Sequence, residues 1–532
     1  MHWRDEQPFQ LRREVHCGDR VVWCFAERPA SVWEMFAASV RAAPDQEAMT
    51  GEEGRMSYGA LADRARRLAG GLIAAGLTQG DRVAILFGNR FAFVETWLAC
   101  QCAGLIAVPM NPRQPAPEIT YAATQCGASA IVFDTELAAH IPAPAEIPSV
   151  RLRAVAYGTA DGATPYEEFF ADPLPPVAVP EEDCATILYT SGTTGRPKGA
   201  MLTHLSIVHS SLHFAYSMEM KAGDRSLLAV PASHVTGLIA NISTALARGA
   251  TIVFLRQFKA AGCLELMARE RVTHTLIVPA MYNLFLLEPE FDGYDLSAWK
   301  IGGYGGAPMP EATIEQMARR APHVGLMNGY GATEATSPTA MNPHRFAASH
   351  RDCVGIALHC TEVGIFDADG TEVPPGEQGE IWMKGPNVVP GYWDNAEANA
   401  RNFVGGYWKS GDVGSMTEDG FIKVHDRIKD MLNRGGFKIY SIEVESQLSF
   451  HPNVMESAII GRPCPVLGER VHAVVVPKGA APGDTLAEDI RAFAAERLSD
   501  YKVPEVIHFR DSPLPRNANG KIIKTQLREE YA

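Results

Sequence analysis

The residues best suited to chemistry lie in one stretch that begins at Ile187 and reads I-L-Y-T-S-G-T-T-G-R-P-K-G. Glycines, small hydroxyl residues and one lysine follow an apolar run. Glycine lets backbone N–H groups approach an anion closely, hydroxyls add donors, and the lysine ammonium balances negative charge. The stretch therefore predicts a strand that opens into a loop for the phosphates of a nucleoside triphosphate. The candidate residues are Thr190, Ser191, Gly192, Thr193, Thr194 and Lys198.

The spacing of this loop differs from that of a Walker P-loop. The Walker pattern is G-x-x-x-x-G-K-[ST], whereas Lys198 lies three residues after Gly195 and is followed by glycine. An ordinary turn between a strand and a helix is the structural alternative, since short Gly/Ser/Thr clusters usually form one. The length of the pattern argues against that alternative.

A second stretch, N-G-Y-G-A-T-E, runs from Asn328 to Glu334. Aromatic, hydroxyl and carboxylate groups at this spacing can stack on a base, bond a phosphate and hold Mg²⁺ through oxygen. Taken alone, the stretch is more typical of a glycine-rich turn with an exposed glutamate. The phosphate loop upstream favours the nucleotide interpretation.

The stretch Y-T-S-G-T-T-G-R-P-K-G resembles the signature loop of the adenylate-forming superfamily, which comprises acyl-CoA synthetases, luciferases and peptide-synthetase adenylation domains. The resemblance extends over nearly the whole chain. Further motifs that carry it are P-A-S-H-V-T-G, G-G-Y-G-G-A-P, W-K-S-G-D-V-G, H-D-R-I-K-D, N-R-G-G-F-K-I and L-P-R-N-A-N-G-K. It implies that a carboxylate attacks the α-phosphate of Mg·ATP, and that a thiol then takes the acyl group from the acyl-AMP.

The resemblance assigns a role to each nucleotide residue. It implies that Tyr330 contacts adenine, Thr333 contacts the α-phosphate, Glu334 binds Mg²⁺ and Asp412 accepts the ribose hydroxyls. Lys521 matches the lysine that bridges the carboxylate and the α-phosphate. Further nucleotide contacts are expected from Gly306, Ala307, Pro308, Asn328, Gly329, Gly331 and Arg427. A dinucleotide interpretation of the segment from Gly302 fails, because Pro308 stands where G-x-G-x-x-G requires glycine.

The acid-binding residues follow from the same resemblance, which places His234 beside the carboxylate pocket and counts it among the catalytic residues. A lone histidine is otherwise more often structural. The remaining expected pocket residues are Val235, Thr236, Gly237, Tyr304 and Met327. Amino-acid-activating relatives usually carry an aspartate near P-A-S-H-V-T-G, and none is present. A substrate without an α-amino group is therefore expected, and the absence of a second cation favours a monocarboxylate.

The C-terminal motifs imply a movement between two half-reactions. Gly435, Gly436 and Lys438 resemble the strip along which the pantetheine of CoA passes, although a β-hairpin turn would look the same. Lys429 matches the hinge about which the small domain rotates. Asp426 departs from the glycine that is usual in the family before Arg427, so the local turn is expected to differ.

The distribution of apolar residues predicts an α/β fold in two domains. A large adenylation domain is expected over residues 1–428 and a small mobile α+β domain over residues 429–532. Helices alternate with short apolar runs in two segments, which predicts a mainly parallel sheet, and the second set of strands, from about 226 to 278, is expected to extend or pair with the first. Antiparallel strands are expected beyond Val354. Thr485 and Glu488 predict a capping box at a helix of the small domain.

Composition places further bounds on the function. The chain has 532 residues, 46% hydrophobic residues and a formal net charge of −14, which disfavours a general nucleic-acid surface. No apolar run reaches about 18 residues and the N-terminal residues do not resemble a signal peptide, so a cytoplasmic protein is expected. The ten cysteines lack zinc-site spacing and are expected to be reduced. A homodimer is possible.

The sequence therefore predicts an AMP-forming ligase that joins a fatty, aromatic or alicyclic carboxylic acid to CoA, with ATP and Mg²⁺. One alternative is transfer of the acyl group to a carrier-protein pantetheine, and a weaker one is a luciferase-type oxygenase. An alternative of another class is a non-catalytic nucleotide sensor. The acid remains open.

Overall fold

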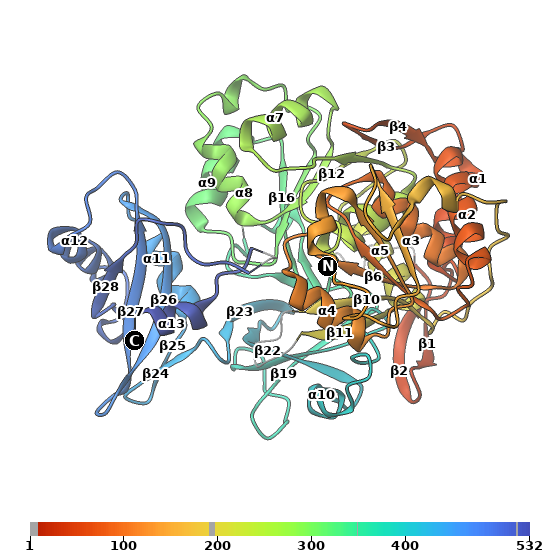
Figure 1. Ribbon diagram of the computed structural model, residues 1–532. Coiled ribbons are helices and arrows are strands. Elements are labelled where there is room, and N and C mark those ends of the chain that lie inside the picture. The colour runs from red at the N-terminus through yellow and green to blue at the C-terminus, as the bar shows by residue number, and fades with distance from the viewer. Residues whose placement is uncertain (1–8, 191–196, 348, 518–519, 532) are drawn as a thin grey trace.

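The computed structural model describes residues 9–190, 197–347, 349–517 and 520–531. Figure 1 shows a large lobe, which contains the N-terminal strands and helices, and a smaller lobe formed by the C-terminal part of the chain. Two large sheets with helices lie in the first lobe and a third sheet lies in the second. The predicted α/β class, with a β-rich portion and a small α+β domain, is confirmed.

The first sheet has seven strands in the described part of the chain, in the order β11-β10-β6-β5-β7-β8-β9. All pair in parallel except β11, which is antiparallel to β10. Val83 and Ile85 pack with the helices between the two large sheets, whereas Ala84 and Leu86 pack against the outer helix α4 (Ala116–Gln125). Both faces are thus covered, which explains why these strands are apolar throughout. The strands are β5 (Arg82–Leu86), β6 (Ile106–Met110), β7 (Ala130–Asp134), β8 (Leu152–Ala156), β9 (Thr164–Pro165), β10 (Cys184–Thr190) and β11 (Lys198–Thr203).

The second sheet combines a parallel half and an antiparallel half. The parallel half consists of β3 (Glu47–Gly51), β12 (Arg225–Leu228), β13 (Thr251–Phe254), β14 (His274–Ile277), β15 (Ile301–Gly305) and β16 (Gly325–Tyr330). The antiparallel half consists of β17 (Ala340–Asn342), β18 (Gly355–Ala357), β19 (Glu362–Phe366), β20 (Gly379–Lys384), β21 (Phe403–Val404), β22 (Tyr407–Met416) and β23 (Phe421–Arg427). The antiparallel strands confirm the pattern expected beyond Val354.

The expectation that the second set of strands pairs with the first is wrong. Strands β12 to β14 lie in the second sheet. Two strands from the early part of the chain also belong to it, namely β3 and its antiparallel neighbour β4 (Gly54–Ser57). A layer of helices separates the two sheets, because each sheet has an apolar face to cover. The helices that contribute to this middle layer are α1 (Val32–Ala42), α2 (Tyr58–Ala74), α3 (Phe91–Ala103), α5 (His204–Ser217) and α6 (Thr244–Arg248). The outer face of the second sheet carries α7 (Ala260–Arg269), α8 (Pro279–Leu287) and α9 (Glu311–Arg320).

The small lobe is a five-stranded sheet with helices on its faces, as counted over the described residues. Its strands are β24 (Leu432–Arg434), β25 (Phe437–Ile439), β26 (Val454–Cys464), β27 (Gly468–Pro477) and β28 (Val506–Phe509). Its helices are α11 (Ser441–Leu448), α12 (Asp484–Ala495) and α13 (Lys524–Glu530). The predicted cap of α12 is wrong, because the helix begins at Asp484 with Gly483 as N-cap, and no side-chain cap bond occurs there in the described structure. The helix buries Leu486, Ile490 and Ala494 against the sheet.

Two elements remain outside these sheets. The N-terminal strands β1 (Leu11–His16) and β2 (Arg20–Phe25) form an antiparallel hairpin, and α10 (Ala396–Asn402) lies beside β21 and β22. Among the residues that the structure describes, no helix combines the length and the apolar character that a membrane crossing requires.

Candidate active site

The loops that follow β15 and β16 form the centre of the candidate site. The two strands are parallel neighbours, with Tyr304 paired to Asn328 and Gly305 to Gly329, so both chains leave the sheet at the same edge. Loops at the carboxyl edge of a parallel sheet are where α/β proteins bind ligands. A Cβ at Gly305 would lie 2.4 Å from the carbonyl oxygen of Gly329, so glycine permits this close approach. The segment Gly306–Pro308 thereby lies beside the segment that begins at Gly331.

The turn after β16 is tightly constrained. A Cβ at Gly331 would lie 1.6 Å from the carbonyl oxygen of Ser337. Thr336 and Ser337 have φ values of 49° and 87°, which are unfavourable for residues with a side chain. Such strained backbone occurs where the surroundings over-determine a functional turn. The turn contains the short helix η6 (Thr333–Ala335), so it fixes the positions of Thr333 and Glu334.

Lys198 and Glu334 are brought together by a tyrosine that the sequence analysis missed. Tyr392 is buried, its hydroxyl donates to Oε1 of Glu334 at 2.8 Å, and the Lys198 ammonium lies 4.4 Å from the centre of its ring. Burial lowers the pKa of Lys198, and the Glu334 carboxylate opposes that shift. Nothing in the spacing of G-Y-W distinguishes Tyr392 from a core aromatic residue.

The phosphate loop is anchored by paired strands at both of its ends. Thr190 ends β10 and pairs with Lys198 at the start of β11, and the Thr190 hydroxyl donates to the Lys198 carbonyl at 3.4 Å. The predicted residues Ser191, Gly192, Thr193 and Thr194 lie outside the described residues. Of the two anchors, Lys198 is linked to Glu334 through Tyr392.

A second group of predicted residues meets at the junction of β16, β22 and β23. The Tyr330 hydroxyl donates to Oδ2 of Asp412 at 2.6 Å, and Nε of Arg427 lies 3.3 Å from Oδ1 of the same carboxylate. Asp412 and Arg427 are cross-strand partners, so the register of β22 and β23 sets their separation. The group presents an aromatic ring, an acceptor and a cation side by side. These are the features expected around adenosine.

Lys521 belongs to the small lobe, but its ammonium lies within electrostatic range of charged groups of the large lobe. Although Lys521 as a whole is exposed, desolvation of the ammonium and the nearby Arg427 lower its pKa to about 8, and Asp412 and Glu334 act in the opposite direction. A lysine 187 positions after Glu334 in the chain thus lies within electrostatic reach of it. The two lobes are therefore arranged with Lys521 at the nucleotide site.

His234 is held neutral beside this lysine. Burial, with a smaller effect from the Lys521 ammonium, lowers the pKa of His234 to about 4. The backbone N–H of Thr236 donates to Nδ1 at 3.2 Å, which assigns the imidazole proton to Nε2. His234 can therefore donate a hydrogen bond to a bound carboxylate, but it does not carry a positive charge at neutral pH.

The segment that contains His234 is held by Asn89, which the sequence analysis also missed. The amide of Asn89 donates to the carbonyls of Leu228, Val230 and Leu255 at 3.0 to 3.1 Å, and its oxygen accepts from Ala232 N–H at 2.9 Å. The chain then enters a π-helix, η4 (Thr236–Ser243), a rare form that is frequent at functional sites. A Cβ at Gly237 would lie 2.1 Å from the carbonyl oxygen of Pro231, so a glycine is needed at this bend.

The expected acyl-pocket residues do not form one wall. Met327 pairs with Gly303, whereas Tyr304 pairs with Asn328, so Met327 and Tyr304 point to opposite faces of the sheet. Met327 packs in the same core cluster as Val235, and Tyr304 packs with Tyr282 in a different one. The two side chains thus lie on opposite faces of the sheet, and a pocket shared by the expected residues stays a prediction.

The predicted CoA residues lie apart from the nucleotide group. Gly435 and Gly436 form the two-residue turn between β24 and β25, with φ values of 61° and 90°. Lys438 is exposed. In Figure 1 this hairpin extends from the side of the small lobe that faces away from β16. In this lobe arrangement the structure therefore brings Lys521, and not Gly436, to the site.

Asp426 does not form a distinctive turn. It continues β23 at a register shift relative to β22, and φ is not positive there. The expected change of local turn is therefore wrong. Its carboxylate has partners in the small lobe, which are described below.

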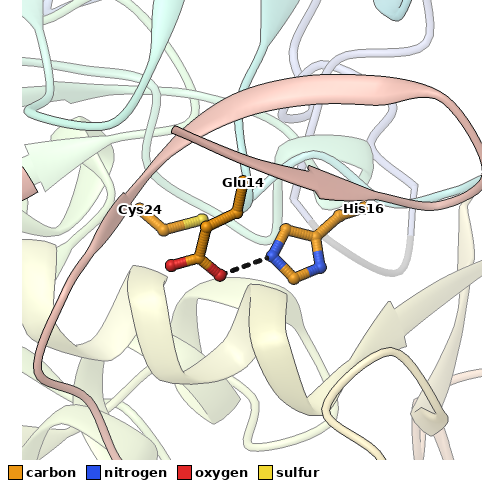
Figure 2. Close-up of side chains that lie close together, drawn as sticks. All are labelled: Glu14, His16 and Cys24. Atoms are coloured by element: carbon orange, nitrogen blue, oxygen red, sulfur yellow. Dashed lines mark hydrogen bonds and ion pairs between the residues drawn. The ribbon is translucent and has the colours of Figure 1, made fainter. Parts of the chain in front are cut away.

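A separate cluster of potential metal ligands lies on the N-terminal hairpin, where Glu14, His16 and Cys24 meet (Figure 2). Its carboxylate already has a cation, because both oxygens of Glu14 accept from the Arg28 guanidinium at 2.7 and 2.9 Å. His16 bonds Glu14 at 3.0 Å and Glu182 at 2.8 Å. Burial raises the pKa of Cys24 to about 12, which keeps the thiol protonated and a poor ligand. The cluster is an ion network that joins the hairpin to the segment before β10.

The pKa of Lys521 predicts a pH limit for the first chemical step. The resemblance implies that the Lys521 ammonium stabilises the transition state of adenylation, and its pKa is about 8 in the ligand-free protein. We expect kcat/KM for ATP in pyrophosphate exchange to be constant below pH 8 and to fall about tenfold per pH unit above it, since kcat/KM reports the free enzyme. His234 adds no limb between pH 5 and 9, because it is already neutral. A profile that stays flat to pH 9.5 in wild type would contradict this assignment.

Comparison with known proteins gives two matches to family patterns. The pattern described as AMP-binding enzyme matches residues 36–393, and the AMP-binding enzyme C-terminal domain matches residues 443–521. A feruloyl-CoA synthase from an Amycolatopsis species is 36% identical over 476 residues, which cover 90% of this chain and 94% of that protein.

A fatty acid–[acyl-carrier-protein] ligase from Streptomyces coeruleorubidus is 32% identical, over 90% of this chain and 92% of that protein. Among solved structures, the o-succinylbenzoate CoA synthetase of Bacillus subtilis, in complex with its acyl-adenylate intermediate, has a TM-score of 0.83 and 29% identity. The superposition covers 94% of this chain and 98% of the chain of that synthetase.

Proposed function

The chain belongs to the AMP-binding enzyme family of adenylate-forming ligases, and from that premise we propose that it is an AMP-forming carboxylic acid:CoA ligase. Its two half-reactions are the formation of an acyl-AMP from an acid and ATP, and the transfer of the acyl group to the thiol of CoA. The observation that carries the proposal is that the charges of Glu334, Asp412 and Arg427 in the large lobe act on the ammonium of Lys521, which belongs to the small lobe. A protein that merely binds a nucleotide has no need for a mobile cation at this point.

The chemistry explains why these groups are needed. A carboxylate is a poor acyl donor, so one of its oxygens must first become part of a phosphate. When the carboxylate attacks the α-phosphorus and pyrophosphate leaves, negative charge accumulates on the phosphate oxygens. Lys521, Lys198 and the Thr333 hydroxyl are positioned to stabilise that charge, and His234 to orient the acid through Nε2. No protein nucleophile is required.

Magnesium is the expected metal, with Glu334 as its protein ligand. The buried carboxylate of Glu334, which Tyr392 links to Lys198, fits the preference of Mg²⁺ for a few carboxylates together with substrate phosphates. The bound ion would neutralise charge on the triphosphate. The roles of Tyr330 near adenine and of Asp412 at the ribose belong to the same proposal.

The second half-reaction requires a different arrangement of the lobes. We assign the hinge to Lys429, with a large domain over residues 1–428 and a mobile domain over 429–532. The end of β23 at Arg427 and the start of β24 at Leu432, in different sheets, support this boundary. Rotation about the hinge would remove Lys521 from the site and bring the Gly435–Gly436 turn to it.

Acid-dependent exchange between ATP and labelled pyrophosphate, run over a panel of carboxylic acids, is the decisive experiment. The proposal expects exchange with at least one acid and release of AMP when CoA is added. AMP release with a holo-carrier protein but not with CoA would favour the carrier-loading alternative. Absence of exchange with every acid would favour a nucleotide sensor.

The acid itself is open between aromatic, alicyclic and fatty monocarboxylates. The absence of an aspartate in P-A-S-H-V-T-G argues against an amino acid. Cytoplasmic location and a homodimer remain predictions from the sequence.

The Gly435–Gly436 turn yields a prediction for the thiol step. Substitution Gly436→Leu places a side chain where, among the described atoms, a Cβ would meet nothing within 4 Å, so folding is affected by the positive φ of 90° alone. We expect thioester formation from supplied acyl-AMP to fall on the order of 10²-fold, because the pantetheine path is obstructed, while pyrophosphate exchange is retained. Both steps are measured by product analysis.

The matched control is Gly479→Leu in the same lobe, where φ is 73° and the surroundings are equally open within the described structure. It introduces the same backbone strain outside the proposed path. Equal loss of thioester formation in both variants would refute the role of Gly436.

A further inference from the structure

Asp426 is a buried carboxylate at the end of β23 whose partners lie in the other lobe. It is 1% exposed. Its Oδ2 accepts from the hydroxyl of Ser441 at 2.7 Å and also from the backbone N–H of Ser441, while Oδ1 accepts from the Arg427 N–H at 2.7 Å. The register shift between β22 and β23 lies next to it and directs the side chain out of the regular strand pattern.

These bonds supply a cap that helix α11 lacks in its own sequence. The N-cap position is held by Tyr440, which makes no side-chain cap bond in the described structure. The first N–H groups of a helix have no partner within it, and negative charge near them is stabilising. Asp426 satisfies the N–H of Ser441 from outside the lobe. It is therefore a helix cap provided by one lobe to the other.

The same contacts continue to the segment that carries Lys521. The Ser441 hydroxyl, which donates to Asp426, accepts from Nζ of Lys524 at 2.6 Å. Lys524 also pairs with Glu445 at 2.7 Å. Lys524 begins α13, three positions after Lys521. A continuous series of hydrogen bonds thus links β23 to the base of the segment that carries Lys521.

We propose that Asp426 is a positioning residue for adenylation: it caps α11 across the hinge and holds the small lobe with Lys521 at the nucleotide site. This proposal rests on the proposed function, because the step that Asp426 would support is the formation of acyl-AMP. Burial raises the pKa of the Asp426 carboxyl and the Lys524 ammonium opposes that rise, as expected for a carboxylate that depends on its docked partners.

The position of the hinge makes the contact specific to one arrangement. Asp426 lies before Lys429, whereas Ser441 and Lys524 lie after it, so any rotation about Lys429 separates the carboxylate from both. The glycine usual in the family at this position could not form these bonds. The hydroxyl of Tyr440 also donates to Gln378 across the same junction, so loss of Asp426 weakens the docked arrangement without removing every contact.

The test compares Asp426→Ala and Asp426→Asn with wild type. Hydrogen exchange of the Ser441 amide reports the contact directly, and we expect its protection to fall about ten- to a hundredfold in Asp426→Ala, the range spanned by hydrogen bonds to charged groups. Asp426→Asn keeps an acceptor and should lose less. The rate of acyl-AMP formation should fall relative to the rate of thioester formation from supplied acyl-AMP, which should be unchanged or faster.

The matched control is Asp352→Asn, which removes the 2.5 Å ion pair to Lys423 on the same strand without involving the small lobe. It should alter neither readout. If Asp426→Ala fails to fold, Ser441→Ala replaces it, with the half-reaction ratio as readout. This variant removes the hydroxyl that donates to Asp426 and accepts from Lys524, and keeps the backbone N–H that donates to Asp426.

Unchanged protection of Ser441 in Asp426→Ala, or an equal fall in both half-reactions, would overturn the proposal. Failure of the proposed function would give a different result. The wild-type protein would then form no acyl-AMP with any acid, while the protection of the Ser441 amide would still depend on Asp426.

Discussion

Replacement of Lys521 by alanine is expected to slow acyl-AMP formation by about 10²- to 10³-fold, the cost of removing one preorganised group that stabilises developing charge. Thioester formation from supplied acyl-AMP should stay near the wild-type rate, because the acyl group is already activated in acyl-AMP and Lys521 is proposed to leave the site for that step. The two rates are measured separately, by pyrophosphate exchange and by thioester production from synthetic acyl-AMP.

The control is Lys478→Ala, which removes an exposed lysine of the same lobe. Its rates should match those of wild type. Equal loss of both half-reactions in Lys521→Ala would indicate that the lysine supports the lobe instead of the chemistry. A normal rate of adenylation would remove Lys521 from the mechanism altogether.

The effect should also appear in the pH profile. Because Lys521 has a pKa of about 8, we assign to this residue the fall in wild-type activity above that pH. The residual activity of the alanine variant should not show this fall. The neighbouring groups cannot replace it. His234 is neutral, and Arg427 is engaged with Asp412.

Several parts of the fold could be predicted from local pattern. Strands such as Arg82–Leu86 are apolar on both faces, and helices such as Phe91–Ala103 follow them within a few residues, which is sufficient to identify α/β units. The pairing of those units could not be predicted in the same way. Whether β12 joins the sheet of β5 or forms another depends on contacts far apart in the sequence, and the pattern within each strand is the same in either case.

The same distinction holds for the site. Residues in contiguous motifs, such as Tyr330 and Glu334, could be proposed because the spacing itself restricts what they contact. Tyr392 and Asn89 were missed because each acts on a segment distant in the chain and occurs in no pattern of its own. The expected acyl-pocket residues Tyr304 and Met327 lie on opposite faces of the sheet, a placement that depends on the pairing of their two strands.

The cap of α12 shows how local signals compete. Thr485 and Glu488 have the spacing of a capping box with Thr485 as N-cap, yet the N-cap is Gly483 and the helix begins at Asp484, two residues earlier than that box predicts. Asp484 places a carboxylate in the first turn, where it interacts favourably with the helix dipole, and Gly483 is itself an acceptable N-cap. At the start of α11 the cap comes from Asp426 in another lobe, which no local pattern could reveal.

Gly331 is the position in the large lobe where a small change should affect both half-reactions. Substitution Gly331→Ala would place a methyl carbon 1.6 Å from the carbonyl oxygen of Ser337, a contact with backbone that cannot be relieved by rotating a side chain. The turn must open, and Thr333 and Glu334 must shift with it. A displacement of about 1 Å can reduce a rate by about 10²-fold, and the forced packing should cost about 1–3 kcal/mol of stability.

The expected pattern differs from that of Lys521→Ala, because the same turn is proposed to hold the AMP portion of the intermediate as well as ATP. Both pyrophosphate exchange and thioester formation from supplied acyl-AMP should therefore fall about 10²-fold in Gly331→Ala, and the melting temperature should drop by a few degrees. The control is Gly262→Ala in helix α7, where the added carbon would meet no described atom within 4 Å, and alanine should stabilise the helix slightly. Normal rates in Gly331→Ala would show that the turn tolerates movement and that its strained residues do not position Thr333 and Glu334. Loss of pyrophosphate exchange alone would show that the turn acts only in the adenylation step.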